Sequence, residues 1–432
     1  MKRVLIITYY WPPTGGSGVQ RWEKFSKYLP EEGWQPVIYT PSNPEMLAVD
    51  ECLQSEIPQE VEIIKTKIIE PYSLYRRFSK KKEINPINSQ KKNWKQKLAL
   101  FIRSNMFVPD PRVTWVSKSV SVLEKYLKEH PVEVIVSTGP PHSMHLIAQR
   151  LSARVNIPWI ADFRDPWTKM FYFKDLSLMR RALKKHQKME QAVLDDADVV
   201  IAVSPLVRND FQNKTGTPVE LITNGYDEED FTMDIKPNGY FNLVHTGLFA
   251  SDGIPTTLWK VLADLMEEDP LLKSRLCIRL VGKTDQEVLE SLKEYGLADV
   301  VLDLGYRSHT ETICEQKAAS VLLLPLRKAP EYRKTMPGKI FEYLASRRPV
   351  LGIGQEDGVA AEFLKRNGAG VMYGWDNYDC IYTFIRKAWE RHKAGEWYCT
   401  SGDISRYSRR SLTRDLVEVM DKLVLKYKKV GV

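Results

Sequence analysis

The chain has 432 residues, 43% hydrophobic and 27% charged, with a formal net charge of +8. The length predicts two domains, and the composition is typical of a globular protein. No apolar run reaches the ~18 residues that span a bilayer, and strand-like sequence begins too early for a signal peptide. The five cysteines are scattered and show no metal spacing, so we expect a cytoplasmic protein with no metal site.

In the first half, apolar runs of strand length alternate with segments of helical period, which predicts a parallel α/β sheet. The strands are expected at Arg3–Thr8, Pro36–Thr40, Val61–Ile68, Val132–Ser137, Trp159–Ala161, Val199–Val203 and Glu220–Ile222. The helices are expected at Val19–Leu29, Val116–Glu129, His142–Val155 and Met179–Asp195. Near-continuous Val, Ile and Leu in "VLIIT" and "VEVIVS" indicates strands covered on both faces.

A basic insertion interrupts this series at about residues 72–112. Ten lysines and arginines lie between Arg76 and Arg103 against one acid, Glu83, with apolar and aromatic residues among them. This pattern suits an anionic surface such as phospholipid, a polyprenyl-phosphate head group or nucleic acid. The alternative is a solvated surface insertion.

A second α/β series begins near Phe241. Its strands read "NLVHTG", "LCIRLVG", "VVLDLG", "VLLLPL", "PVLGIG" and "GVMYG", and helices start near Thr256, Asp285, His309, Gly338 and Gly358. Residues 224–238 resemble a hinge, and Arg409–Lys429 has the spacing of a closing helix. We therefore predict two doubly wound Rossmann-like domains, residues 1–225 and 240–400, facing across a cleft, with a final helix in 405–432.

Ligands of open α/β sheets bind beyond the carboxyl ends of the strands, so the residues that follow each strand are candidates for the site. In the first half these are the glycine loop after Thr8, "TGPPHS" with His142, and "ADFRDPW" with Asp162, Arg164 and Asp165. In the second half they are Gly247, Gly282 and the pair Arg327-Lys328. Each has a structural alternative: a flexible bend, a helix start, an internal salt-bridged turn or a solvated pair.

The segment "MPGKIFEYLASRRPVL" is the most specific of these. Gly338 lets a ligand approach the backbone of a helix start, where N–H groups attract a diphosphate. Lys339 and Glu342 share one helix face and supply a cation for phosphate and a carboxylate for two ribose hydroxyls. The alternative is a buried amphipathic helix with an incidental surface salt pair.

This segment resembles the C-terminal signature of GT-B retaining glycosyltransferases of family 4, of the bacterial surface-polysaccharide type, which commonly reads P-x-K-x-x-E-Y-x-A-x-x-x-P-V. The glycine loop, "TGPPHSMHLIAQRL", "PWIADFRDPW", "VSPLVRNDF" and "ITNGYDEEDF" extend the resemblance in order over most of the chain. It implies a GT-B fold in which the N-terminal domain binds the acceptor and the C-terminal domain binds a nucleotide-diphosphate sugar. The closing helix would return to the N-terminal domain.

The resemblance also implies roles for single residues. We expect Glu342 to grip the ribose, the glycine loop to lie near the diphosphate and sugar, and His142 to lie near the donor sugar. The candidate catalytic residues are His142, Asp162 and Asp165, and the candidate acceptor-binding residues are Trp11 and Arg164. The candidate donor-binding residues are Gly15, Gly16, Gly18, Gly247, Gly282, Arg327, Lys328, Gly338, Lys339 and Glu342.

Two positions depart from the family pattern. Lys334 stands where many members carry a second glutamate, and "TGLFASDGIP" has Leu248 and Asp252 where many members carry an Arg and a Lys for the diphosphate. Either Arg327, Lys328, Arg333 or Lys339 supplies the missing countercharge, or the donor is bound in an unusual way.

The expected activity is metal-independent, retaining transfer of a sugar to a lipid-linked or polysaccharide acceptor at the inner face of the cell membrane. No cofactor beyond the nucleotide-sugar co-substrate and no nucleic-acid partner are expected. The alternatives are a GT-B sugar-nucleotide epimerase and an inactive membrane-associated homologue. A dinucleotide oxidoreductase is disfavoured, because "GGSG" does not read G-x-G-x-x-G.

Overall fold

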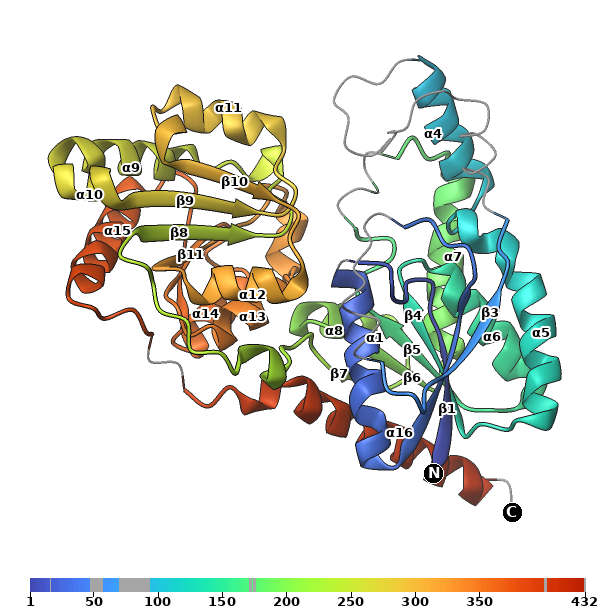
Figure 1. Cartoon of the computed structure of the whole chain (residues 1–432). Helices are drawn as coiled ribbons and strands as arrows, with labels where there is room; N and C mark the ends of the chain where they lie inside the picture. Colours follow the sequence, from blue (N-terminus) through green and yellow to red (C-terminus); the bar gives the residue numbers. More distant parts are fainter. Residues whose placement is uncertain are drawn as a thin grey trace. The chain divides into compact units, whose positions relative to one another are not determined.

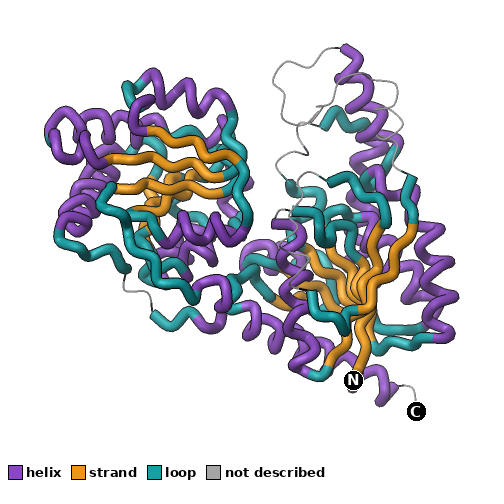
Figure 2. The backbone as a smooth tube through the Cα atoms, viewed as in Figure 1, coloured by secondary structure: helices purple, strands orange, loops and turns teal. Residues whose placement is uncertain are grey.

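The computed structural model describes residues 1–15, 17–46, 57–69, 94–170, 173, 176–399 and 402–430. The chain forms two compact units. Unit 1 comprises Met1–Thr223 and Leu412–Val432, and unit 2 comprises Asn224–Ser411. In both, strands form a central sheet with helices packed on it (Figure 1, Figure 2).

Among the described residues, unit 1 contains a seven-stranded sheet in the order β3-β2-β1-β4-β5-β6-β7, with every neighbouring pair parallel. The strands are β1 (Lys2–Ile7), β2 (Trp34–Pro41), β3 (Glu62–Thr66), β4 (Val134–Gly139), β5 (Trp159–Phe163), β6 (Val199–Ala202) and β7 (Val219–Leu221). Its helices are α1 (Ser17–Tyr28), α4 (Trp94–Met106), α5 (Val116–Glu129), α6 (Ser143–Val155), α7 (Arg180–Asp196) and α8 (Pro205–Gln212).

The alternation of side chains along β1 divides the core of unit 1 into two layers. Leu5 and Ile7 pack in one cluster with residues of α5 and α6. Val4 and Ile6 pack in the other with residues of α1 and of α16 (Arg409–Val430). The apolar face of α16 (Leu412, Leu416, Met420 and Leu423) is therefore part of the core of unit 1.

Unit 2 contains, in its described part, a six-stranded parallel sheet in the order β10-β9-β8-β11-β12-β13. The strands are β8 (Phe241–Thr246), β9 (Leu276–Val281), β10 (Val301–Gly305), β11 (Val321–Pro325), β12 (Val350–Ile353) and β13 (Gly370–Tyr373). The helices are α9 (Thr256–Glu268), α10 (Pro270–Arg275), α11 (Gln286–Glu294), α12 (His309–Lys317), α13 (Lys339–Ala345), α14 (Val359–Arg366) and α15 (Tyr378–Lys393). The predicted fold class, two parallel-sheet α/β domains, is confirmed.

The sequence pattern did not predict α15, the longest helix that lies wholly within the described part of unit 2. α15 buries only a narrow stripe, Ile381, Ile385 and Trp389, within a sequence rich in charge and aromatic residues. Its place is set by tertiary contacts, because Tyr378 and Tyr382 donate hydrogen bonds to carboxylates of α9. A stripe of three residues is too weak a periodic signal to predict a helix by itself.

Residues 224–238, which resembled a hinge, group with unit 2. Lys317 donates to the carbonyls of Phe231 and Met233, and Arg348 Nη2 donates to the carbonyl of Ile235 at 2.7 Å. His309 lies 2.9 Å from a carboxylate oxygen of Asp230. These contacts hold the segment on the surface of unit 2.

Candidate functional site

Two glycines lie where β8 and β9 of unit 2 end. Gly247 has φ 89° and Gly282 has φ 116°, a region that side chains rarely adopt. Their N–H groups donate to the carbonyls of Val281 and Gly305, both at 2.7 Å. A Cβ on Gly282 would lie 2.5 Å from the carbonyl oxygen of Gly247. The backbone conformation therefore requires glycine at both positions.

We expect Gly282→Ala to destabilise unit 2 by about 1–3 kcal/mol, because the new methyl group needs an unfavourable φ and collides with backbone. Urea unfolding followed by circular dichroism measures the change. Gly296→Ala is the matched control, since Gly296 also has a positive φ but no atom lies within 4 Å of its added Cβ. Equal losses in the two variants would show that φ, and not the contact with Gly247, determines the effect.

Lys339, from the first turn of α13, reaches the end of β8. Its Nζ lies 2.5 Å from the carbonyl oxygen of Thr246, to which it donates, and 3.4 Å from Nε2 of His245. The same Nζ lies 3.4 Å from the position that a Cβ on Gly247 would take. Burial lowers the pKa of Lys339 to about 7, and the charge of Glu342 opposes this shift only in part. The amine is thus held at the strand-end glycines, and no carboxylate of the described residues is in contact with it.

His245 was not identified from the sequence. Its Nδ1 lies 3.1 Å from the carbonyl oxygen of Leu323, and burial, reinforced by the charge of Lys339, lowers its pKa well below the usual value. His245 Nε2 lies 3.4 Å from Lys339 Nζ and 3.3 Å from the carbonyl oxygen of Leu248. In the tautomer that carries hydrogen on Nδ1, Nε2 accepts from Lys339, and His245 then helps to position the lysine.

Glu342 lies one turn after Lys339 on α13 and is held by Gln316 of α12. Gln316 Nε2 donates to Glu342 Oε2 at 2.8 Å and lies 3.3 Å from the hydroxyl of Thr246. Glu342 Oε1 has no hydrogen-bond partner within the described part of the chain. Gln316, a second residue that sequence reasoning missed, orients a carboxylate that keeps one oxygen for a ligand.

The remaining donor candidates of unit 2 are more peripheral. Arg327 lies 3.5 Å from a carboxylate oxygen of Asp252 and over the ring of Tyr332, and Lys328 is exposed. Gly338 precedes α13, which has only seven residues, so its helix dipole is a weaker attraction for phosphate than we expected. In unit 2 the structure thus brings together Gly247, Gly282, Lys339 and Glu342.

In unit 1, Asp162 forms an internal ion pair with a residue outside the "DFRD" turn. Its carboxylate accepts from Arg21 Nη2 at 2.9 Å, from Trp22 Nε1 at 2.7 Å and from the hydroxyl of Thr138 at 2.8 Å. Burial by itself raises the pKa of Asp162. Arg21, Trp22 and Thr138 together lower it by more, so the pKa lies below its usual value. Because Asp162 is fully buried and saturated with donors, it has no oxygen available to a substrate, contrary to the catalytic role expected for it.

Arg164 also makes internal contacts. Its terminal nitrogens donate to the carbonyls of Gly18 and Pro140, which joins the start of α1 to the loop after β4. A Cβ on Gly18 would lie 2.8 Å from Nη1 of Arg164, so the position of the arginine side chain favours a glycine at residue 18. The neighbouring Asp165 is half-buried, and burial raises its pKa to about 6, against the charge of Arg164. Asp165 is therefore the carboxyl group of this turn that suits proton transfer near neutral pH.

His142 is buried at the start of α6. Its ring stacks on Trp167 with centroids 4.5 Å apart, and neither ring nitrogen has a hydrogen-bond partner among the described residues. Burial, with smaller contributions from His145, His186 and Arg164, lowers its pKa well below the usual value. Asp110, which the sequence did not single out, accepts from the N–H and hydroxyl of the next residue, Ser143. The imidazole is neutral and retains its full hydrogen-bonding capacity.

The glycine loop is described only in part. Gly15 is half-buried, whereas Gly16 lies outside the described residues. Trp11 is 3% exposed and packs in the core layer of α1, and its Nε1 has no hydrogen-bond partner among the described residues. Most of the basic stretch from Arg76 to Arg103 also lies outside the described residues.

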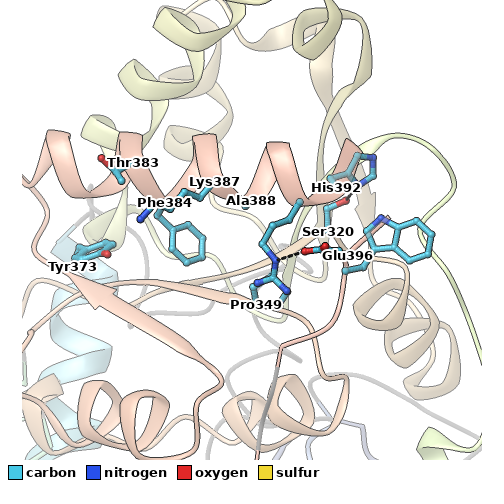
Figure 3. A pocket seen from close by; sticks show the side chains of 11 residues that line it. Ser320, Pro349, Tyr373, Thr383, Phe384, Lys387, Ala388, His392 and Glu396 are labelled. Atoms are coloured by element: carbon cyan, nitrogen blue, oxygen red, sulfur yellow. Dashed lines mark hydrogen bonds and ion pairs between the residues drawn. The ribbon is translucent and has the colours of Figure 1, made fainter. Parts of the chain in front are cut away.

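A cavity of about 290 Å³ in unit 2 is separate from these groups. Its lining comes from α15, from Tyr373 of β13 and from Ser320 and Pro349, which directly precede β11 and β12 (Figure 3). Arg391 and Glu396, also in the lining, form an ion pair with N and O 3.7 Å apart. None of the predicted donor residues lines it.

Within the described ranges, no three His, Cys, Asp or Glu side chains gather as metal ligands. No helix in that part of the chain has both the length and the apolar character needed to cross a membrane.

The two parallel α/β units have the fold of known GT-B glycosyltransferases. An alpha,alpha-trehalose-phosphate synthase (UDP-forming) from Burkholderia vietnamiensis is 11% identical, with 99% of this chain and 100% of that chain covered and a TM-score of 0.59. WaaG, a glycosyltransferase involved in lipopolysaccharide biosynthesis, is 14% identical, with coverage of 99% and 98% and a TM-score of 0.53. A protein described as a UDP-N-acetylglucosamine 2-epimerase from Listeria monocytogenes is 8% identical, with coverage of 97% and 95% and a TM-score of 0.55.

Residues 18–230 match the family model Glycosyltransferase Family 4. A search of curated protein sequences found no significant match. The family match, together with the fold, supports an enzyme of the glycosyltransferase class.

Proposed function

We propose that this glycosyltransferase takes a sugar from a nucleotide-diphosphate donor bound on unit 2, and that Lys339 and Glu342 are its principal contacts. The observation that carries the proposal is the placement of Lys339 Nζ beside the carbonyl of Thr246 and the glycine ends of β8 and β9. The Arg and Lys common in the family are missing from the loop after Gly247, and Lys339 supplies the cation from α13 instead. Glu342 Oε1 accepts from the ribose hydroxyls.

The chemistry we propose is retaining and metal-independent. The acceptor oxygen forms a bond to the anomeric carbon on the face from which the diphosphate departs, and the bond from that carbon to the phosphate oxygen breaks. The acceptor proton passes to the departing phosphate oxygen. Lys339 in its ammonium form, with Arg327 and Lys328 farther out, stabilises the negative charge that develops there. The strand-end glycines allow close approach of the diphosphate to backbone.

On unit 1 we propose that His142 hydrogen-bonds the donor sugar and that Asp165 accepts a hydrogen bond from the acceptor hydroxyl and orients it, while the proton itself passes to the phosphate. A neutral imidazole with both nitrogens available suits hydroxyl groups. Asp162 and Trp11 take structural roles. The name of WaaG supports a lipid-linked or polysaccharide acceptor, and we place the reaction at the cytoplasmic face of the cell membrane.

We expect Glu342→Gln to weaken nucleotide binding by roughly 10- to 150-fold, since a hydrogen bond to a charged group contributes about 1.5–3 kcal/mol. The measurement is the shift in melting temperature with UDP, GDP and CMP. Glu362→Gln on α14 is the matched control, because Glu362 is exposed and far along the chain from the glycines.

No shift of the unaltered protein with any of these nucleotides would contradict the proposed function, and an undiminished shift in Glu342→Gln would contradict the role of Glu342. Product analysis by NMR without acceptor separates transfer from epimerisation. A change of sugar configuration under those conditions would identify an epimerase.

A further inference from the structure

The exposed face of α7 is strongly cationic. Five lysines and arginines occur within nine residues, and the interval contains no acid: Arg180, Arg181, Lys184, Lys185 and Lys188. All five are exposed, and none forms an ion pair with a described residue. Met179 and Leu183 lie among them and are 48% and 37% exposed. The opposite face of the helix, with Ala182 and His186, is buried.

α4 adds large apolar side chains to this face. Leu98 is 50% exposed, Phe101 39%, Ile102 40% and Met106 72%. The sequence of α4 contains no acidic residue. Monomeric proteins rarely expose several neighbouring large apolar side chains without a binding purpose.

The two helices are joined in the structure. The side chain of Asn105 donates to the carbonyl of Ser177 at 2.9 Å and accepts from the N–H of Met179 at 2.7 Å. The end of α4 is thereby fixed to the start of α7, and the helices contact each other (Figure 1). The apolar residues of α4 and the cations of α7 therefore belong to one surface of unit 1.

We propose that the α4–α7 surface docks unit 1 on an anionic lipid bilayer. Leucine, isoleucine, phenylalanine and methionine side chains enter the boundary between head groups and acyl chains, while lysines and arginines bind lipid phosphates. Nucleic acid fits less well, because its phosphate backbone offers nothing to four exposed apolar side chains on α4. This surface contains none of the residues assigned to the reaction. The inference rests on the proposed reaction at the membrane face and deepens it by naming the surface that docks there.

The test is co-sedimentation of the full chain with vesicles of phosphatidylglycerol and phosphatidylcholine, and with vesicles of phosphatidylcholine alone. We expect binding to the anionic vesicles that weakens in high salt. The triple variant K184E/K185E/K188E should lose at least about tenfold in affinity, because three attractions to lipid become repulsions. The double variant Leu98→Ser with Phe101→Ser should also bind more weakly.

The matched control is K293E/K365E/R366E, which changes three exposed cations of unit 2 and alters the net charge equally. This control should bind like the unaltered protein. Melting temperatures and the nucleotide-induced shift should be preserved in every variant, which separates loss of docking from loss of folding or of donor binding.

Unchanged sedimentation of K184E/K185E/K188E would overturn the proposal. An equal loss in the unit 2 control would also overturn it, since net charge alone would then explain binding. Two further results would overturn the proposal. One is loss of vesicle binding only when the charges of Lys80, Lys81, Lys82, Lys91 and Lys92 are reversed by substitution with Glu. The other is binding to a single-stranded oligonucleotide without binding to vesicles.

Discussion

Lys339→Met is expected to weaken binding of a nucleotide sugar by roughly 10- to 150-fold, the effect of losing one charged hydrogen bond to phosphate. The unaltered protein should also take up close to one proton when it binds the donor at pH 8. Burial holds the pKa of Lys339 at about 7, so the amine is mostly neutral at pH 8 before binding. A diphosphate beside it favours the ammonium form, which raises the pKa and draws in a proton.

The sign of the pH dependence follows from this shift. Affinity should be nearly constant below pH 6 and should fall above pH 7, approaching about tenfold per pH unit while the bound lysine stays protonated. The other titratable groups in contact with Lys339 or acting on its pKa are His245 of β8 and Glu342 of α13. His245 remains neutral throughout, because burial keeps its pKa well below the usual value.

Isothermal titration with UDP-glucose and GDP-mannose, in buffers of different ionisation enthalpy, measures both quantities. A nucleotide sugar has no phosphate group that titrates between pH 7 and 9, so proton uptake reports on the protein. Lys339→Arg should keep most of the affinity and show no uptake, and Lys365→Met on α14 is a matched control. Donor binding without proton uptake would refute the role of Lys339 and leave the proposed function standing.

Asp162→Asn is expected to destabilise unit 1 by about 3–5 kcal/mol, because it leaves the buried charge of Arg21 without its partner. Arg21 is 1% exposed and lies against the carbonyls of Ile222 and Thr223 as well as Asp162. Calorimetry and urea unfolding measure the loss. Glu124→Gln removes the partner of Arg154 in an exposed pair with N and O 2.9 Å apart, and should cost less than about 1 kcal/mol.

A similar small cost in both variants would show that the buried pair contributes little. Replacement of both partners, Arg21→Leu with Asp162→Leu, should recover part of the stability, because no buried charge is then left alone. If Asp162→Asn kept full stability and lost sugar transfer, the carboxylate would regain the catalytic role expected from the sequence.

The fold was accessible from sequence because parallel strands buried on both faces have an unmistakable composition. β1, β4 and β6 each contain three or four consecutive Val, Ile and Leu residues, and the helices between them keep a clear helical period. α15 was not accessible, since three buried residues in sixteen carry little periodic signal. Its position depends on hydrogen bonds to α9, which lies more than a hundred residues earlier in the chain.

The candidate site divides in the same way. Glycines at strand ends and the spacing of Lys339 and Glu342 could be identified from sequence, because the topology of a parallel sheet gathers strand ends at one edge. The partners of these residues could not. His245 and Gln316 come from other elements, and only packing brings them to Lys339 and Glu342.

The sequence by itself determined the α/β class, the two-part organisation and the residues that follow each strand, since these depend on local composition and period. Tertiary structure alone decided which charged groups are available. Asp162, Arg164 and Asp165 are neighbours in the chain, yet Arg21 saturates the first, two backbone carbonyls hold the second, and the third is left with a pKa of about 6. The physical reason is that burial and partners arriving from distant segments set the charge state and accessibility of a side chain.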